Sequence, residues 1–537
     1  MSISRRGILC AGAGAGWLPL VSCAPHPIRA AMKPFDVEER TLAELQTELA
    51  TGRIGSADLV ALYVERIDRI DRAGPRLASV IELNPDAPEI ARVLDAERSA
   101  RGARGPLHGI PILLKDNIDT HDRMQTSAGS LALVGSAPDE DAFVVQRLRA
   151  AGAVILGKTN LSEWANIRSS ASSSGWSARG GLTRNPHALD RSASGSSSGS
   201  AAAVAASLCA AAVGTETDGS IISPSSVCGI VGLKPTVGLL SRSGIVPIAH
   251  SQDTAGPMAR TVRDCALLLT AMTGVDRRDA AMSGATGAPR SPVDYIGALD
   301  QKALKGARLG VVRQFFGFHE ASDRVFASTL AALTAAGAVL VDPVAIPAIE
   351  TVSDAELTVL LYELKADLNA YLQGRRNAPV RSLAEVIAFN DANAAREMPW
   401  FGQDLFLKAE AKGPLTDADY VKARELCLRI AATEGIEAQM RTHSLDALIA
   451  PSGGPAWRSD RVLGDHFVGG NSTTPAAVAG TPSITVPAGA VQGLPIGLSF
   501  FAQAWSEPRL LALAYAFEQA TRVRVRPSYR ATVDDAG

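Results

Sequence analysis

The sequence predicts an α/β fold, and two observations carry that prediction. Short apolar runs bounded by turn residues, which are typical of buried strands, alternate along the chain with segments whose apolar residues recur at helical spacing. The chain of 537 residues, with 46% apolar and 5% aromatic side chains, is also long enough to bury a large core. Length alone suggests about two to four domains, although a large α/β enzyme can also form one unit.

The first 31 residues are predicted to be an export leader. The letters S-R-R-G-I-L at 4–9, followed by an apolar, glycine-rich run to Val21, resemble a twin-arginine signal. The letters L-V-S-C at 20–23 weakly resemble a lipoprotein cleavage box, so a lipid anchor at Cys23 stays open. The apolar run is too short and too broken by glycine and proline to span a membrane. We therefore expect an extracytoplasmic, periplasmic protein.

The N-terminal part of the folded chain is predicted to place a lysine in the interior. Helical spacing predicts helices over 57–72 and 90–103, and the apolar run from Ile110 to Lys115 predicts a short buried strand. A lone buried lysine is rare unless it is paired or catalytic. Lys115 is therefore a candidate catalytic residue, and a salt bridge to a buried carboxylate is the structural alternative.

A phosphate-binding loop is suggested by one motif and excluded by its context. Residues 152–159 match G-x-x-x-x-G-K-[ST], a loop that requires a strand before its first glycine and a helix after it. Here 140–151 is predicted to be a helix and 153–156 a strand, so the order is reversed. We expect no nucleotide.

Residues 190–224 form two serine-bearing loops around an alanine run. The run at 200–213 consists of small, helix-forming residues and is predicted to be a tightly packed helix. The letters G-S-S-S-G at 195–199 match a nucleophile elbow centred on Ser197. An elbow needs a buried strand before it, whereas the residues before Gly195 are polar and turn-forming, so the elbow interpretation fails.

The C-terminal half continues the alternation of strands and helices. A long region at 354–441 is predicted to be helical, with its leucines in the core. The remaining predicted helices are 261–273, 323–336 and 509–520, and the predicted strands are 307–315, 338–342, 445–450, 483–486 and 496–502.

Charge and ligand chemistry exclude several functions. Lysine and arginine number 53 against 55 acidic residues, no basic cluster lies outside the N-terminus, and a nucleic-acid partner is therefore not expected. The histidines are dispersed without H-E-x-x-H, so we expect no metal and no cofactor. Outside the leader four cysteines are scattered without C-x-x-C, and one disulfide bond stays open: Cys209, Cys228, Cys265 and Cys427.

Three segments together resemble the amidase signature family: G-I-P-I-L-L-K-D-N at 109–117, G-S-S-S-G-S-A-A-A at 195–203 and G-T-E-T-D-G-S-I at 214–221. Further matching segments lie at 158–164, 232–238, 251–260 and 480–489. The resemblance covers about Thr41 to Thr521. It implies one catalytic domain over 32–537, with a central mixed β-sheet flanked by helices on both faces and an insertion at about 354–441 that walls the substrate cleft.

The same resemblance implies a Ser-Ser-Lys triad. Ser220 is the expected nucleophile, Ser196 the bridging serine, preceded by a cis peptide bond, and Lys115 the base. A serine hydroxyl becomes a good nucleophile only when a neighbour takes its proton, and lysine can do so only when neutral. Lowering the pKa of lysine from ~10.4 toward ~7 costs roughly 4 kcal/mol, which burial can supply.

Other residues are expected to support this triad. The turn formed by Thr217, Asp218, Gly219 and Ser220 is the expected oxyanion hole, because its backbone N–H groups can point at one anion. Ser197 is expected to join the hydrogen-bond network. The loop near Ser170 and the insertion are expected to set substrate specificity.

The resemblance implies a hydrolase that cleaves carboxamide C–N bonds. Asp218 and Ile222 replace a glycine and an arginine of the common family pattern, which weakens an assignment to the glutamine-tRNA amidotransferases. S-G-W-S-A-R-G-G at 174–181 and the leader are similar to those of bacterial peptide amidases and imply removal of the C-terminal amide of peptides. General acyl, aryl or fatty-acid amide hydrolysis is the alternative, and an extracytoplasmic binding lipoprotein without turnover is the alternative of another class.

Overall fold

The computed structural model describes residues 35–284 and 293–533. The leader at 1–31, with its arginine pair and Cys23, lies outside the described residues. The chain divides into the units Met1–Asp36 and Val37–Gly537, and the fold below is that of the second unit.

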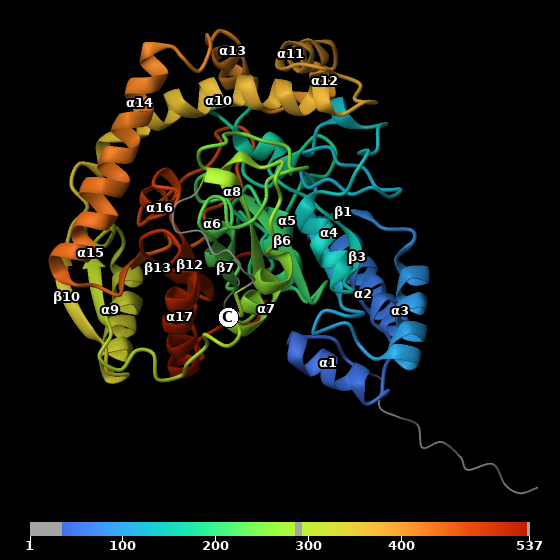
Figure 1. Cartoon of the computed structure of the whole chain (residues 1–537), viewed down its shortest axis with the longest axis horizontal. Coiled ribbons are helices and arrows are strands. Elements are labelled where there is room, and N and C mark those ends of the chain that lie inside the picture. The colour runs from blue at the N-terminus through green and yellow to red at the C-terminus, as the bar shows by residue number, and fades with distance from the viewer. Residues whose placement is uncertain (1–34, 285–292, 534–537) are drawn as a thin grey trace, which may run out of the picture. The chain divides into compact units, whose positions relative to one another are not determined.

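An eleven-stranded mixed sheet forms the centre of this unit, in the order β1-β3-β2-β6-β8-β7-β12-β13-β11-β9-β10 (Figure 1). A separate two-stranded hairpin consists of β4 Trp176–Ser177 and β5 Gly181–Leu182. The strands of the large sheet are β1 Val80–Leu83, β2 Pro111–Lys115, β3 Val154–Thr159, β6 Ala211–Glu216, β7 Val231–Lys234, β8 Thr254–Ala259, β9 Arg308–Val312, β10 Val339–Val344, β11 Ala447–Pro451, β12 Ser483–Val491 and β13 Leu494–Phe501. β2 pairs in parallel with both β3 and β6, whereas β8 pairs antiparallel with β6 and β7. Every residue of β2, β6, β8 and β13 is buried, which requires cover on both faces of the sheet. The predicted α/β fold is confirmed.

Helices follow most strands along the chain. They are α1 Leu42–Ala50, α2 Ser56–Arg66, α3 Ala87–Arg101, α4 Phe143–Ala150, α5 Ser198–Ala205, α6 Ile222–Val227, α7 Val262–Met272, α8 Ala280–Gly284, α9 Glu320–Ala335, α10 Ser353–Gly374, α11 Leu383–Ala392, α12 Ala394–Glu397, α13 Asp404–Glu410, α14 Ala418–Leu428, α15 Glu437–His443, α16 Thr474–Val478 and α17 Glu507–Thr521. Two segments continue helices as π-helix, Ile67–Arg72 after α2 and Arg429–Ile436 between α14 and α15.

The predicted helical region at 354–441 forms α10 to α15. Figure 1 shows α10, α11, α12 and α13 together at the top of the view, apart from the strands. Leu361, Leu364 and Leu368 of α10 are buried in one apolar cluster with residues of α11 and α13. These leucines therefore belong to the core, as their helical spacing predicts.

One predicted element is wrong. The alanine run at 200–213 is not one helix, because α5 ends at Ala205 and β6 begins at Ala211. Ser207, at φ 55°, turns the chain between them. The alanines of β6 pair with β2 on one side and β8 on the other, so sheet pairing outweighs the helix propensity of alanine.

Two further observations concern the helices and the thiols. Within the described ranges, no helix has the length and apolar character needed to cross a membrane. The four cysteines of the folded unit are buried free thiols, so the disulfide bond that the sequence left open does not form between them.

Candidate active site

Lys115 ends β2 with its side chain fully buried. Its Nζ lies 2.7 Å from Ser196 Oγ, 2.8 Å from Thr215 Oγ1 and 3.1 Å from the carbonyl oxygen of Thr215. These partners are hydroxyl and carbonyl oxygens. Among the described residues, Lys115 therefore forms no salt bridge of the kind that the structural alternative required. Burial lowers the pKa of Lys115 to about 7, although the charges of Asp253 and Glu216 oppose that shift.

Lys115 is not the lone buried lysine that the sequence suggests. Lys158 and Lys234 are fully buried as well. Lys158 Nζ donates to Thr126 Oγ1 at 2.8 Å, and burial lowers its pKa. Burial therefore does not single out Lys115; its contact with a loop serine does.

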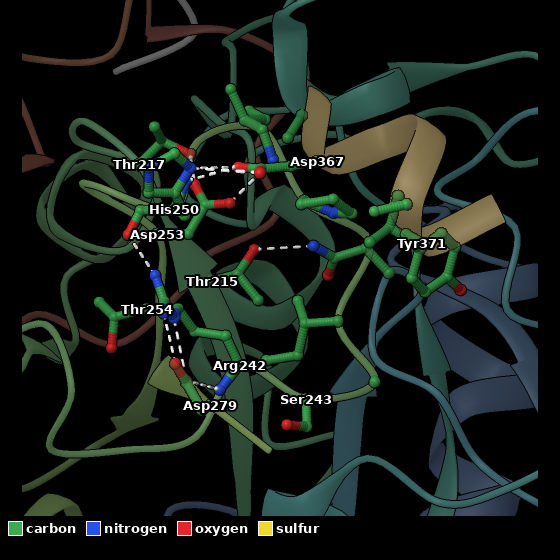
Figure 2. A pocket seen from close by; sticks show the side chains of 18 of the residues that line it. Thr215, Thr217, Arg242, Ser243, His250, Asp253, Thr254, Asp279, Asp367 and Tyr371 are labelled. Atoms are coloured by element: carbon green, nitrogen blue, oxygen red, sulfur yellow. Dashed lines mark hydrogen bonds and ion pairs between the residues drawn. The ribbon is translucent and has the colours of Figure 1, made fainter. Parts of the chain in front are cut away.

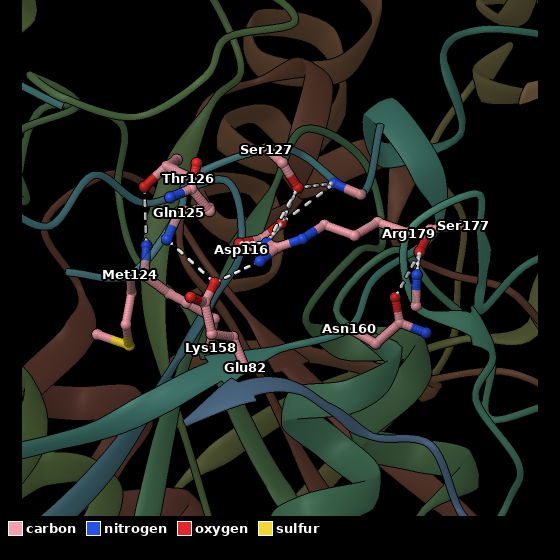
Figure 3. A network of polar contacts seen from close by, with 12 residues as sticks. Glu82, Asp116, Met124, Gln125, Thr126, Ser127, Lys158, Asn160, Ser177 and Arg179 are labelled. Carbon is pink, nitrogen blue, oxygen red and sulfur yellow. Dashed lines mark hydrogen bonds and ion pairs between the residues drawn. The ribbon is translucent and has the colours of Figure 1, made fainter. Parts of the chain in front are cut away.

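Asp116, the next residue, belongs to a separate polar network (Figure 3). Its carboxylate accepts from Ser127 and forms an ion pair with Arg179 at 3.2 Å, and Arg179 also pairs with Glu82. Lys115 and Asp116 thus bind different partners although they are neighbours in the chain. This network ties the end of β2 to the segment around the β4–β5 hairpin.

Ser196 and Ser197 lie in the loop that leads into α5. The peptide bond between Gly195 and Ser196 is cis, as the resemblance implies. A Cβ on Gly195 would lie 2.2 Å from Ser162 Oγ, so only glycine fits there. Ser197 Oγ donates to the carbonyl oxygen of Thr215 at 3.0 Å and accepts from its N–H at 3.2 Å, which fastens this loop to β6.

Ser220 lies in the turn between β6 and α6. Its carbonyl oxygen accepts from the N–H of Ser197 at 3.1 Å, so the two serine loops are in direct contact. Glu216 fixes the far side of the turn, because its carboxylate accepts from the N–H groups of Ile221 and Ile222 at 2.7 and 2.9 Å. Gly219 has φ 78°, and a Cβ there would lie 3.0 Å from Thr473 Oγ1. The structure thus brings the sequence-predicted residues 115, 196, 197 and 220 into one contiguous network.

The other predicted residues lie around this network. Thr217 Oγ1 donates to Asp253 at 2.6 Å, and Asp218 accepts from Thr474 Oγ1 at 2.7 Å. Ser170 is exposed, and its Oγ and N–H both bind the carboxylate of Asp404 on α13, at 2.8 and 2.9 Å. Its hydrogen bonds thus attach its loop to the helical insertion.

Sequence reasoning missed Thr215 and Asn117. Thr215 Oγ1 is a partner of Lys115 and also accepts from Asn117 Nδ2 at 3.0 Å. Both residues lie at the carboxyl ends of β2 and β6, which pair in parallel. Parallel strands bring their carboxyl ends to one edge of a sheet, so a predicted pairing of these two strands would have indicated that Thr215 and Asn117 meet Lys115.

A cavity of about 390 Å³ lies beside Thr215, and Figure 2 shows its lining. Asn117, Thr215 and Thr217 line it on the side of the active site, and Tyr371 of α10 also lines it. Asn117 is nearly fully buried, and no hydrogen-bond partner for its Oδ1 occurs in the described part of the chain. Asp253 also lines this cavity, and burial raises its pKa to about 6.

His250 and Asp367 line this cavity, and together with Glu363 they form a group of side chains whose ligand atoms lie close enough to hold a metal ion. The ring nitrogens of His250 lie 2.9 Å from Asp367 and 3.4 Å from Glu363. Hydrogen bonding to Asp367 raises the pKa of His250. The contacts of His250 with these two carboxylates join the loop before β8 to α10.

Similar proteins were found by sequence and by structure. Residues 58–511 match the amidase family model. A probable amidase of Arabidopsis thaliana is 41% identical over 504 residues, covering 92% of each chain. A glutamyl-tRNA(Gln) amidotransferase component of Moorella thermoacetica is 35% identical over 495 residues, covering 90% of this chain and 97% of the relative. The solved peptide amidase of Stenotrophomonas maltophilia is 51% identical with a TM-score of 0.87, covering 92% of this chain and all of the other.

These matches extend over nearly the whole second unit, from α2 to α17. They support an enzyme that hydrolyses amides rather than a binding protein without turnover. The chain therefore belongs to the amidase family.

Proposed function

We propose that this amidase removes the C-terminal amide of peptides through an acyl-enzyme, with Ser220 as nucleophile, Ser196 as bridging serine and Lys115 as base. One observation carries the proposal: a fully buried lysine with a pKa of about 7 lies 2.7 Å from Ser196 Oγ. Near neutral pH about half of such lysines are neutral and can accept a proton.

In the proposed reaction, Lys115 takes the proton of Ser196 while Ser196 takes that of Ser220. A hydroxyl both donates and accepts, so Ser196 can pass a proton without changing its own protonation state. Ser220 Oγ attacks the amide carbonyl, and the backbone N–H groups of residues 217–220 stabilise the oxyanion. Preorganised donors of this kind contribute about 3 to 4 kcal/mol each.

The proton on Lys115 then returns through Ser196 to the departing nitrogen, because an amide anion cannot leave. Ammonia departs and Ser220 carries the acyl group. Water attacks the acyl-enzyme, and the same relay accepts its proton and returns it to Ser220. The proposed path uses no metal and no nucleotide.

The peptide substrate is supported by the similarity to the peptide amidase, whose sequence is half identical to this one. The other relatives carry broader names, so acyl, aryl and fatty-acid amides form the second candidate class. The direct test is ammonia release from a panel of amidated peptides, their free-acid counterparts, simple carboxamides and a long-chain acyl amide. The proposal requires the highest kcat/KM for amidated peptides, and faster turnover of the long-chain amide would contradict it.

Ser220 is expected to be the only serine labelled by a fluorophosphonate probe. Its turn follows a buried strand and offers donors to the phosphonyl oxygen, whereas Ser197 Oγ is already bound to the backbone of Thr215 on both sides. Peptide mapping by mass spectrometry locates the label. Ser220→Ala should abolish labelling and Ser197→Ala should keep it; a label on Ser197 would contradict the assignment.

We also propose that the leader exports the folded enzyme by the twin-arginine route. In a periplasm-bearing host, Arg5→Lys with Arg6→Lys should shift amidase activity from the extracytoplasmic fraction to the cytoplasm, since the route reads the arginine pair. Cys23→Ala tests the lipid anchor separately, because it should release the enzyme from membranes without blocking export. Unchanged export of the arginine variant would refute the route.

A further inference from the structure

Four exposed apolar side chains are concentrated in one short stretch. Residues 452–473, here called the rim loop, connect β11 to α16. Val462, Leu463, Phe467 and Val468 in this loop are 73%, 71%, 61% and 49% exposed. In the described part of the chain only thirteen large apolar side chains are exposed, and four of them lie within the seven residues 462–468. A concentration of exposed apolar side chains is typical of a surface that contacts a ligand, a membrane or another protein.

The rim loop is attached to Ser174, which lies next to the loop of Ser196. Asp465 accepts from the N–H of Ser174 at 3.1 Å and from Ser174 Oγ. A Cβ built on Gly195 would lie 3.2 Å from that same Ser174 Oγ, so this attachment point borders the Gly195–Ser196 bond directly. Trp457 Nε1 also donates to Asp465 at 3.1 Å, which fixes the indole at the same point.

The end of the rim loop is fastened to the turn of Ser220. Thr473 Oγ1 lies against Gly219, and Thr474, which follows the loop, donates to Asp218 at 2.7 Å. The rim loop is therefore attached at Asp465 to Ser174, which borders Gly195, and at its end to the turn of Ser220.

Two of the exposed residues, Phe467 and Val468, also line a small slot. Ser223 of α6 and Trp457 of the rim loop line the same slot. The N–H of Ser223 donates to the carbonyl oxygen of Gly219 at 2.8 Å, and its Oγ lies 2.8 Å from Ser194 Oγ. Ser223 thus brings the slot next to both serine loops, and two residues that line it are aromatic: the rings of Trp457 and Phe467 are 4.5 Å apart.

The other side of the rim loop meets the helical insertion. The guanidinium of Arg461 lies 4.2 Å from the ring centroid of Trp400, which is itself 39% exposed. Apolar side chains thus extend from the catalytic loops toward the insertion.

We infer that the rim loop is the specificity surface for the acyl part of the substrate, and that Leu463 and Phe467 bind apolar side chains of the residues that precede the terminal carboxamide. This inference rests on the proposed peptide substrate. When the scissile amide is at the C-terminus, the whole remainder of the peptide is the acyl part. The bound peptide must then extend from the catalytic serines along a neighbouring surface of the enzyme. Burying Leu463 and Phe467 against an apolar side chain of the substrate makes the binding free energy more favourable. Peptide amides with apolar residues before the carboxamide are therefore preferred.

The test compares two substrates in the full-length enzyme: N-acetyl-Leu-Phe-amide and N-acetyl-glycinamide. Leu463→Ser with Phe467→Ser should lower kcat/KM for the apolar dipeptide amide about ten- to a hundredfold, the range expected when a pocket loses apolar contacts, and leave that for acetylglycinamide within about twofold. Val339→Ser is the matched control, because Val339 is 45% exposed on β10, the edge strand at the other end of the sheet from β2, and should change neither value.

The remaining outcomes separate the inference from the proposed function. An unchanged substrate ratio in the double variant overturns the inference alone. An equal loss for both substrates also overturns it, since the loop would then only position the catalytic serines. A change in oligomeric state without a change in the ratio identifies the patch as a contact between copies of the chain. If the wild-type enzyme hydrolyses simple carboxamides but neither peptide amide, the proposed function fails, and the inference fails with it.

Discussion

Replacing Lys115 by methionine is expected to lower kcat about 10²- to 10⁴-fold, the effect of losing a general base, while the enzyme stays folded. Methionine keeps most of the volume of the lysine at the end of an entirely buried strand, so the packing of β2 is largely preserved. Ammonia release measures the activity, and circular dichroism with a thermal melt measures the fold.

Lys115→Arg distinguishes a base from a structural cation. A guanidinium stays protonated in proteins, so arginine could replace lysine in a salt bridge but not as a proton acceptor. Near-native turnover in this variant would overturn the assigned role, and the base would have to be another residue.

The pH profile gives the second test of the lysine. The neutral form is the active one, so kcat/KM should rise as pH increases through about 7, the pKa that burial gives Lys115. Lys158→Met is the matched control, because this lysine is equally buried but donates to Thr126 rather than to a catalytic loop. That variant should be less stable to unfolding. Its remaining kcat/KM should still rise with pH through the same value as in the wild-type enzyme.

Replacing Arg168 by methionine is expected to reduce the free energy of unfolding by about 3–5 kcal/mol, the cost of leaving a buried charge without its partner. Arg168 and Glu163 are fully buried and form an ion pair at 2.9 Å. The guanidinium also donates to the carbonyl oxygen of Glu397 and lies 4.4 Å from the ring centroid of Phe401. One side chain therefore joins the core to the segment that follows α12.

Urea unfolding followed by fluorescence measures the loss. Arg324→Met is the matched control, because the Arg324–Glu320 pair on α9 is exposed and such pairs contribute at most about 1 kcal/mol. The difference between Arg168→Met and wild type should shrink in acid, since protonated carboxyl groups need no cation. A loss for Arg168→Met no larger than that of the control would contradict the expected role of the buried pair.

The sequence predicted the elements with strong local signals. The strand ending at Lys115 is an apolar run between turn residues, and it is β2 within one residue. The reversed order of helix, glycine and strand around Gly152 is also as predicted, with α4 before the glycine and β3 after it. In these places the local pattern and the tertiary structure favour the same conformation.

The features that could not be predicted depend on contacts between distant residues. The alanines at 211–213 become a strand only because β2 and β8 lie on either side. Likewise, three buried lysines look alike in sequence, and only the position of Ser196, 81 residues away, distinguishes Lys115 from the others. Thr215 and Asn117 meet only because parallel strands end at one edge of the sheet.

The parallel pairing of β2 with β6 has a consequence for how this enzyme could change its substrate. Lys115 ends β2, Ser220 follows β6, and the loop of Ser196 is bound to β6, so the whole proposed relay is built on two adjacent strands. The rim loop and the helices at 354–441 are separate insertions between other strands. The inferred role of the rim loop and the proposed relay thus predict that substrate choice and proton transfer can change separately: grafting the rim loop of another amidase should redirect the enzyme to a different acyl group and leave the chemistry on β2 and β6 unchanged.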